Sequence, residues 1–211
     1  MANENLKRLA PLTGVLFLVL VVASFMIEGE SPDLGAGGEE IVEFYDDNEG
    51  QTIAAAIVAS LAAVALVFFA ATVRRALRRE EREIGVLSAA AFGGGIVAAA
   101  GIATDSAFRF ALAESADEID PTALEALHAL WENFFLPMVV GVAVLVLATS
   151  LAALRARFMP VWMAWIGFVI VLALFTPIGF FAFLVAALWL AILSVLLWRQ
   201  EPATPAAAGV T

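Results

Sequence analysis

Long apolar runs, each close to the length of a bilayer crossing, recur along most of the chain. A spanning α-helix needs about 20 mostly apolar residues, and six runs approach or reach that length: about 9–27, 52–73, 84–104, 134–154, 160–176 and 178–197. Because 63% of the 211 residues are hydrophobic and only 15% are charged, a soluble globule would lack polar surface. The sequence predicts an all-α, polytopic transmembrane bundle of six spanning helices, forming one domain over 1–200, with a flexible tail at 201–211.

The last two runs form one almost unbroken apolar stretch, which has to be divided. A single helix over 160–197 would be nearly twice as long as the hydrocarbon core is thick. The segment Phe175-Thr176-Pro177-Ile178-Gly179 contains the two residues that most often end a helix. We therefore expect two helices that meet at this segment.

The basic residues predict which way the helices run. Ten of the eleven Lys and Arg residues fall before the first run, after the last, or in alternate connections, and Arg109 is the exception. The positive-inside rule makes that side cytoplasmic. Both termini are then cytoplasmic, the protein lies in the cell (plasma or inner) membrane, and the acidic loop 28–51 is outside. Cleavage of the first run as a signal peptide is the alternative, which would leave five helices.

Two polar connections also carry helical signals. In 39–48 the apolar residues recur at helical spacing, which favours a short interfacial helix leading into the second span. Asp120 is a good N-cap and Pro121 suits the first turn. We expect the fourth membrane helix to begin there, outside the lipid, and to continue with a kink through Pro137.

Polar side chains gather at the start of that helix. Glu125, His128 and Glu132 are spaced i, i+3 and i+7 and so share one face, and Asn133 lies beside them. Ionisable groups near a membrane interior pair or line cavities, so this face is a candidate polar or ligand site. His128, the single His, is a possible proton acceptor there.

Asp105 and Arg109 complete the candidate site if the third span extends far enough to make them an i, i+4 pair. Together with the His128 face they would form a polar pocket. The alternative is structural: the residues lie at head-group level, and Asp105 or Glu132 neutralises Arg109 as a clamp. The spacing leaves both interpretations open.

Small residues mark the second and third spans. Gly93, Gly94 and Gly95 give the third span a face on which a neighbouring backbone can approach closely, and Ala55, Ala59 and Ala63 do the same for the second. We expect the two spans to pack on each other, with oligomerisation or local unwinding as alternatives. The Trp residues lie near predicted helix ends and are expected to anchor depth at the interface: Trp131, Trp162, Trp165, Trp189 and Trp198.

Residue counts exclude several chemistries. Without Cys there is no thiolate metal site, iron–sulfur cluster or cysteine nucleophile, and one His is too few for a membrane bis-His haem. His-Glu-x-x-His does not occur, and Glu125-x-x-His128 lacks the second copy that a di-metal site needs. We expect no cofactor and no metal, and the net charge of −10 argues against nucleic acid.

The segment Leu154–Gly167, with its basic turn followed by Pro160-x-Trp162-x-x-x-x-Gly167, and the later Leu188–Ser194 resemble uncharacterised six-helix bacterial membrane proteins of the domain-of-unknown-function kind. The resemblance extends over most of the chain. It implies a six-helix fold and carries no catalytic residue.

Three functions are compatible with these patterns. The first is a non-enzymatic membrane subunit or accessory protein, whose partners would be the lipid bilayer and a membrane protein or a second copy bound through the small-residue faces. The second is a small-solute or cation transporter that uses the polar site, which predicts a cavity reaching it. An intramembrane enzyme is the third, and no nucleophile and base pair supports it.

Overall fold

The computed structural model describes residues 9–33, 35–80 and 85–200. Lys7, Arg8, Arg82 and the expected tail at 201–211 lie outside these residues. All regular structure in the described part is helical. The helices are η1 (Ala10–Leu12), α2 (Thr13–Glu28), α3 (Gly38–Asp47), α4 (Glu49–Glu80), α5 (Val86–Glu114), α6 (Pro121–Glu132), α7 (Leu136–Ala156), α8 (Val161–Leu174) and α9 (Gly179–Gln200).

Five stretches of described helix are long and apolar enough to cross a membrane: Ala10–Glu28, Glu49–Arg79, Val86–Glu114, Pro121–Ala156 and Gly179–Gln200. This confirms an all-α bundle with membrane-spanning character. The fifth expected span, 160–176, is the one missing from these five stretches; it corresponds to α8, which has only 14 residues. At 1.5 Å per residue, α8 is about 21 Å long, shorter than the hydrocarbon core of about 30 Å.

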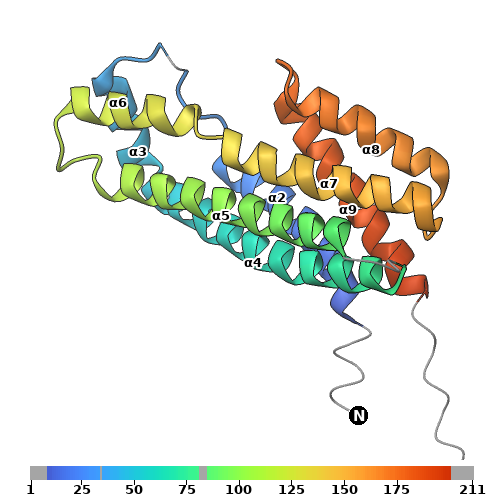
Figure 1. Ribbon diagram of the computed structural model, residues 1–211. Helices are drawn as coiled ribbons and strands as arrows, with labels where there is room; N and C mark the ends of the chain where they lie inside the picture. The colour runs from blue at the N-terminus through green and yellow to red at the C-terminus, as the bar shows by residue number, and fades with distance from the viewer. Residues whose placement is uncertain (1–8, 34, 81–84, 201–211) are drawn as a thin grey trace, which may run out of the picture.

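The long helices lie side by side with their axes roughly aligned, and helices that follow one another run in opposite directions (Figure 1). α4, α5 and α7 form one layer, α2 lies against α4, and α8 and α9 form a hairpin beside α7. η1, which leads into α2, contacts the second half of α9, since Ser194 Oγ donates a hydrogen bond to the carbonyl of Pro11. The expected division of the last apolar stretch is confirmed, because α8 ends at Leu174 and α9 begins at Gly179.

Glycines allow α5 to lie directly against both of its neighbours. A Cβ on Gly95 would overlap Ala70 of α4, and one on Gly94 would meet the backbone of α7 at Leu145. Gly141 of α7 lies equally close to the backbone of Ala98. The expected packing of the second and third spans is therefore present, and the same Gly-rich face also holds α7.

α3, α6 and the end of α5 from Asp105 onward form what we call the cap, at the left end of Figure 1. The cap has its own apolar core, separate from that of the bundle: Ala36, Ile41, Tyr45, Leu112, Ala116, Leu124 and Trp131. Ile41 and Tyr45 belong to the apolar face of α3 and are 1% and 2% exposed. That face packs on protein, mainly α6, rather than on lipid as an interfacial helix would.

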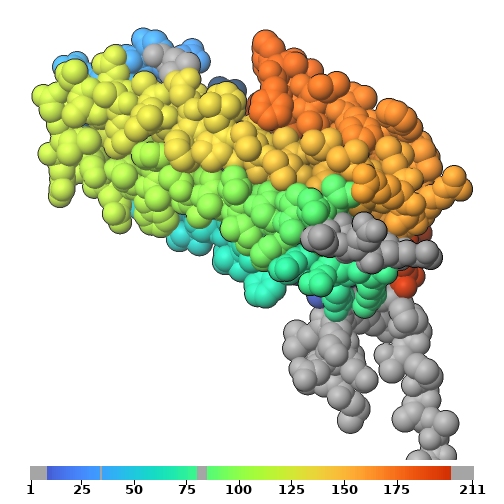
Figure 2. All heavy atoms as spheres, viewed as in Figure 1, coloured from blue at the N-terminus to red at the C-terminus, as the bar shows by residue number. Residues whose placement is uncertain are grey.

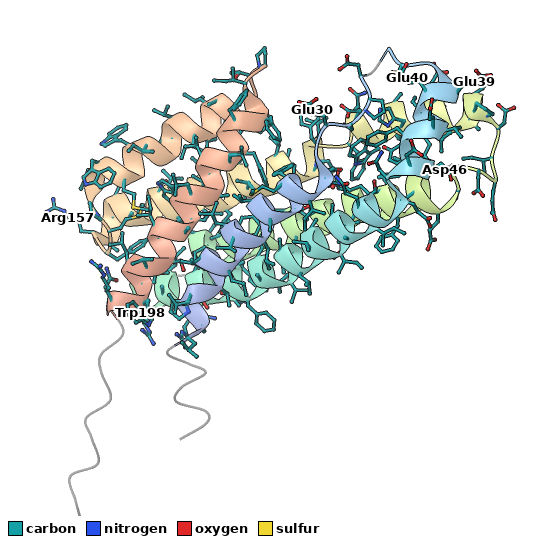
Figure 3. All side chains as sticks on the ribbon, turned by 180° about the vertical axis from the view of Figure 1, so that it is seen from behind. Glu30, Glu39, Glu40, Asp46, Arg157 and Trp198 are labelled. Carbon is teal, nitrogen blue, oxygen red and sulfur yellow. The ribbon has the colours of Figure 1, made fainter. Side chains whose placement is uncertain are left out.

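Charges divide the molecule into two ends (Figure 3). The end of the molecule that holds the cap carries four labelled acidic residues, Glu30, Glu39, Glu40 and Asp46, and we call it the acidic end. Arg157 lies at the opposite, basic end, where α4 also finishes with Arg78 and Arg79 in its last turn and α9 with Arg199.

The α6–α7 connection and two Trp side chains differ from expectation. Asp120 caps α6 as predicted, accepting a hydrogen bond from the Thr122 amide at 2.9 Å, but the helix stops at Glu132 and α7 restarts at Leu136 with Pro137 in its first turn. The helix is thus interrupted between Glu132 and Leu136, whereas we expected one continuous helix with a kink at Pro137. Trp189 and Trp131 are 3% and 9% exposed; they are core residues rather than interfacial anchors.

Candidate functional site

Arg109, the single Lys or Arg residue between 83 and 154, lies where the bundle meets the cap. Its Nη1 is 2.5 Å from Oε2 of Glu28 at the end of α2, and its Nη2 is 2.9 Å from Oδ2 of Asp105, one turn earlier on α5. The side chains of Arg109 and Glu28 are only 8% and 11% exposed, and that of Asp105 is 22% exposed. The guanidinium is thus shared between two largely buried carboxylates.

Local sequence places each of these groups. α5 continues ten residues past the apolar run that ends at 104, so Asp105 and Arg109 become the expected i, i+4 pair. Glu28 is the last residue of α2 because Gly29 has φ 71° and ψ −149°, a conformation open only to glycine. The chain turns sharply there, which leaves the Glu28 side chain at the bundle while the following loop runs over the cap.

Trp131 of α6 closes the cluster from the cap side. Its Nε1 donates a hydrogen bond to Oδ1 of Asp105 at 2.9 Å, and its ring lies 5.5 Å from the Arg109 guanidinium carbon. A cation over an indole face at this distance is stabilised by the ring's quadrupole. Within the described chain, Nε of Arg109 meets no hydrogen-bond acceptor. Arg109 therefore joins α2, α5 and α6.

His128 lies deeper in the cap and holds two other segments. Its Nε2 is 3.2 Å from the carbonyl oxygen of Pro32, and its Nδ1 is 3.0 Å from the hydroxyl of Tyr45. A carbonyl can only accept, so Nε2 carries the proton; a neutral ring then accepts the Tyr45 hydroxyl proton at Nδ1. Burial raises the pKa of Tyr45 above its ordinary value, which keeps that hydroxyl a donor. The imidazole thus fastens α3 and the α2–α3 loop onto α6.

A cavity of about 320 Å³ lies against the Arg109 cluster. Its polar end is formed by Glu28, Asp105, Arg109, Trp131 and Glu132. The remaining wall is mainly apolar and comes from α2, α4, α5, α7 and α9, including Val21, Phe25, Ala59, Ala62, Ile102, Phe135, Met138, Phe180 and Phe183. This combination of an apolar wall and a few converging polar groups is typical of small-molecule sites.

Glu132 differs from the other carboxylates of the cavity. It is half-buried at the end of α6, and among the described residues it has no hydrogen bond or ion pair. Three carboxylates and one guanidinium line the polar end, so its formal charge with all groups ionised is −2. An unpaired carboxylate beside a buried cluster favours a cationic ligand electrostatically.

The residues expected at the site separate into three environments. Asp105, Arg109 and Glu132 line the cavity, whereas His128 is 1% exposed and fully used within the cap. Glu125 is exposed, and Asn133 ends α6 at the surface with its Nδ2 donating to the Ala129 carbonyl.

Sequence reasoning missed two members of the cluster. Glu28 was assigned to the acidic loop and Trp131 to the interface. The available signal for Glu28 was its position between an apolar run and a glycine.

No group of three or more His, Cys, Asp or Glu side chains within the described residues is arranged to hold a metal ion. Comparisons of the chain with protein-family models, with curated proteins and with solved structures found no match.

Proposed function

We propose that the chain crosses the plasma membrane six times, with both termini in the cytoplasm and the acidic end outside. Support comes from the gathering of basic residues at one end of the bundle. The α8–α9 hairpin supports an even number, since its two apolar helices run there and back from the basic end. Because α8 is shorter than the hydrocarbon core, its crossing requires the bilayer to thin locally around the hairpin, so that the tip lies at the outer boundary of the acyl chains.

The absence of native Cys makes this topology directly testable. Single Cys residues at Glu30, exposed at the acidic end, and at Arg155, exposed at the basic end, would be labelled with an impermeant maleimide in intact cells. Glu30→Cys should react from outside, and Arg155→Cys only after lysis. Labelling of both from the same side would overturn the six-span arrangement.

We propose further that the protein is a non-enzymatic binding protein, which takes a small cation-bearing molecule into the cavity beside Arg109. The observation that carries this proposal is the unpaired, half-buried carboxylate of Glu132 facing a cavity whose polar end has a net negative charge. Burying that carboxylate without a partner is costly, so a cationic ligand restores the balance.

The inner end of the cavity is closed. Val21, Ala59 and Ala62 form its floor, and the fully buried Phe17, Leu66 and Phe69 lie on the same helices one to three turns closer to the basic end. This arrangement favours binding over a continuous pore. Transport would require these helices to separate.

Thermal unfolding of the purified full chain with a panel of organic ammonium compounds tests the binding proposal. Bound ligand stabilises by mass action, so at least one member should raise the melting temperature of the wild type. Glu132→Gln should abolish that rise. Glu125→Gln, the same change on the exposed part of the same helix, is the matched control and should keep it.

Two results would refute the proposal. One is a panel, with and without long alkyl chains, that leaves the wild type unchanged. The other is a stabilisation that both variants retain equally, since the Glu132 carboxylate would then have no part in binding.

A further inference from the structure

The surface of the tip of the α8–α9 hairpin is apolar apart from Thr176, whose hydroxyl donates a hydrogen bond to the Ala173 carbonyl. No charged residue occurs between Arg157 and Arg199, and Phe175, Ile178 and Phe181 at the tip are 58 to 66% exposed. Large apolar side chains exposed on this scale indicate contact with lipid. Since α8 is only about 21 Å long, a hairpin that crosses from the basic end has its tip at the acyl-chain boundary of the outer leaflet, while the cap extends beyond it.

The cavity beside Arg109 continues toward this tip. A second cavity of about 430 Å³ shares six wall residues with the first, namely Phe25, Glu132, Phe135, Met138, Phe180 and Phe183. Its far wall is formed by Thr176, Pro177 and Gly179 at the hairpin turn. The two cavities therefore form one passage from the ionic cluster to the lipid-embedded tip.

The passage reaches the surface between the α6–α7 junction and the hairpin. Figure 2 shows a notch on this face, between the yellow region of α6 and α7 and the orange tip of α8 and α9. Phe135 on one side and Phe180 on the other are 47% and 54% exposed. An opening with aromatic walls beside a lipid-embedded tip faces acyl chains rather than water.

We propose that the occupant of this passage is a membrane lipid of the same leaflet whose head group carries an ammonium group. Its ammonium lies against Glu132 at the polar end, and an acyl chain follows the walls of Phe135, Met138 and Phe180 toward the tip. This inference rests on the proposed binding function and specifies its ligand. The passage is complementary to such a lipid in two ways. Its charged end has more carboxylates than cations, which suits the ammonium group, and its opening is apolar, which suits the acyl chain.

Retention of defined lipids by the purified full chain, measured by native mass spectrometry, tests the inference. Three probes share the same acyl chains: phosphatidylethanolamine, its N-acetylated form without the ammonium, and phosphatidylglycerol. The fourth probe, glycerophosphoethanolamine, has the ammonium and no chains. We expect phosphatidylethanolamine to be retained about tenfold or more over each of the other three probes. The N-acetylated form and phosphatidylglycerol lack the hydrogen-bonded charge pair with Glu132, and glycerophosphoethanolamine lacks the acyl-chain contacts.

Two variants separate the contributions of head group and chain. Glu132→Gln should bring retention of phosphatidylethanolamine to the level of its N-acetylated form, whereas Glu125→Gln should not. Met138→Trp, which fills the passage at a half-buried position, should reduce retention of every chain-bearing probe about tenfold or more. Circular dichroism and melting temperature confirm that each variant is folded.

The outcomes distinguish this inference from the proposed function. Equal retention of the three chain-bearing probes would overturn the inference, because the passage would bind chains without regard to the ammonium. Binding of the chainless probe as tight as that of phosphatidylethanolamine, unaffected by Met138→Trp, would also overturn it, yet leave a cation-binding protein. Failure of every ammonium compound, with or without chains, would refute both.

Discussion

Arg109→Met removes the single cation from a junction built around it. Met has a similar length and fills the space, so the change isolates the charge. Glu28, 11% exposed, loses the cation 2.5 Å away and stays buried with its charge uncompensated. Removing one partner of a buried ion pair costs about 3–5 kcal/mol. For a chain of this size, roughly 2–4 °C in melting temperature per kcal/mol gives a fall of about 6–20 °C.

A second substitution checks the cause of that loss. In the double variant Arg109→Met, Glu28→Gln no charge is left unpaired at the more deeply buried position. Asp105, 22% exposed, keeps its hydrogen bond from Trp131 and reaches water more easily. We expect the double variant to be more stable than Arg109→Met alone, by a coupling of about 1–3 kcal/mol.

Thermal unfolding in detergent, followed by tryptophan fluorescence, measures both changes. Arg155→Met at an exposed position of the basic end is the control and should cost less than about 1 kcal/mol. A wild-type melting temperature for Arg109→Met, or simple addition of the costs of Arg109→Met and Glu28→Gln, would contradict this prediction. Either result would mean that the guanidinium does not hold the junction together.

Two further predictions concern helix packing and the cap. Gly141→Leu should destabilise the fold by about 3 kcal/mol or more, since its side chain would collide with the backbone of Ala98. The control is Gly93→Ala, which should melt at or above the wild-type temperature because nothing lies within 4 Å of the added Cβ. Equal melting temperatures for the two variants would contradict the packing of α5 against α7. Burial raises the pKa of Tyr45 in the folded protein above that of an unfolded chain. The neutral Tyr45 hydroxyl therefore contributes its full stabilisation below a pH of about 10, and this stabilisation is lost as the pH rises through the pKa of the folded state. Tyrosinate absorbance of this single Tyr should therefore appear only as the cap opens. The Tyr45→Phe variant should lose less stability than the wild type as the solution becomes alkaline. Ionisation at a pH of about 10, with the circular dichroism still native, would disprove the burial of Tyr45 against His128.

Local sequence signals predicted most helix positions. Asp120 and Pro121 start α6, and the Pro and Gly at 177 and 179 separate α8 from α9, because caps and helix breakers act within one turn. The i, i+4 pair of Asp105 and Arg109 is local as well. Such features can be read from a sequence without knowing the fold.

The rest of the site depends on contacts between distant segments. Glu28 is 81 residues from Arg109 and belongs to a loop rich in acids, so its spacing does not mark it as the partner. The shared helical face of Glu125, His128 and Glu132 was predicted, but α6 crosses from solvent through the cap core to the cavity edge. Glu125, His128 and Glu132 share one helical face, yet they lie in solvent, in the cap core and at the cavity edge, respectively. Amphipathic periodicity likewise cannot tell whether the apolar face of α3 covers lipid or protein.

The ionic junction imposes an order on assembly. Glu28 is synthesised 81 residues before Arg109, so the end of α2 has no arginine to pair with until α5 has been made. During that interval we expect the carboxylate to stay hydrated, because its burial without a cation would be costly. We therefore expect α2 to reach its final packing only once α5, the third long helix, is in place.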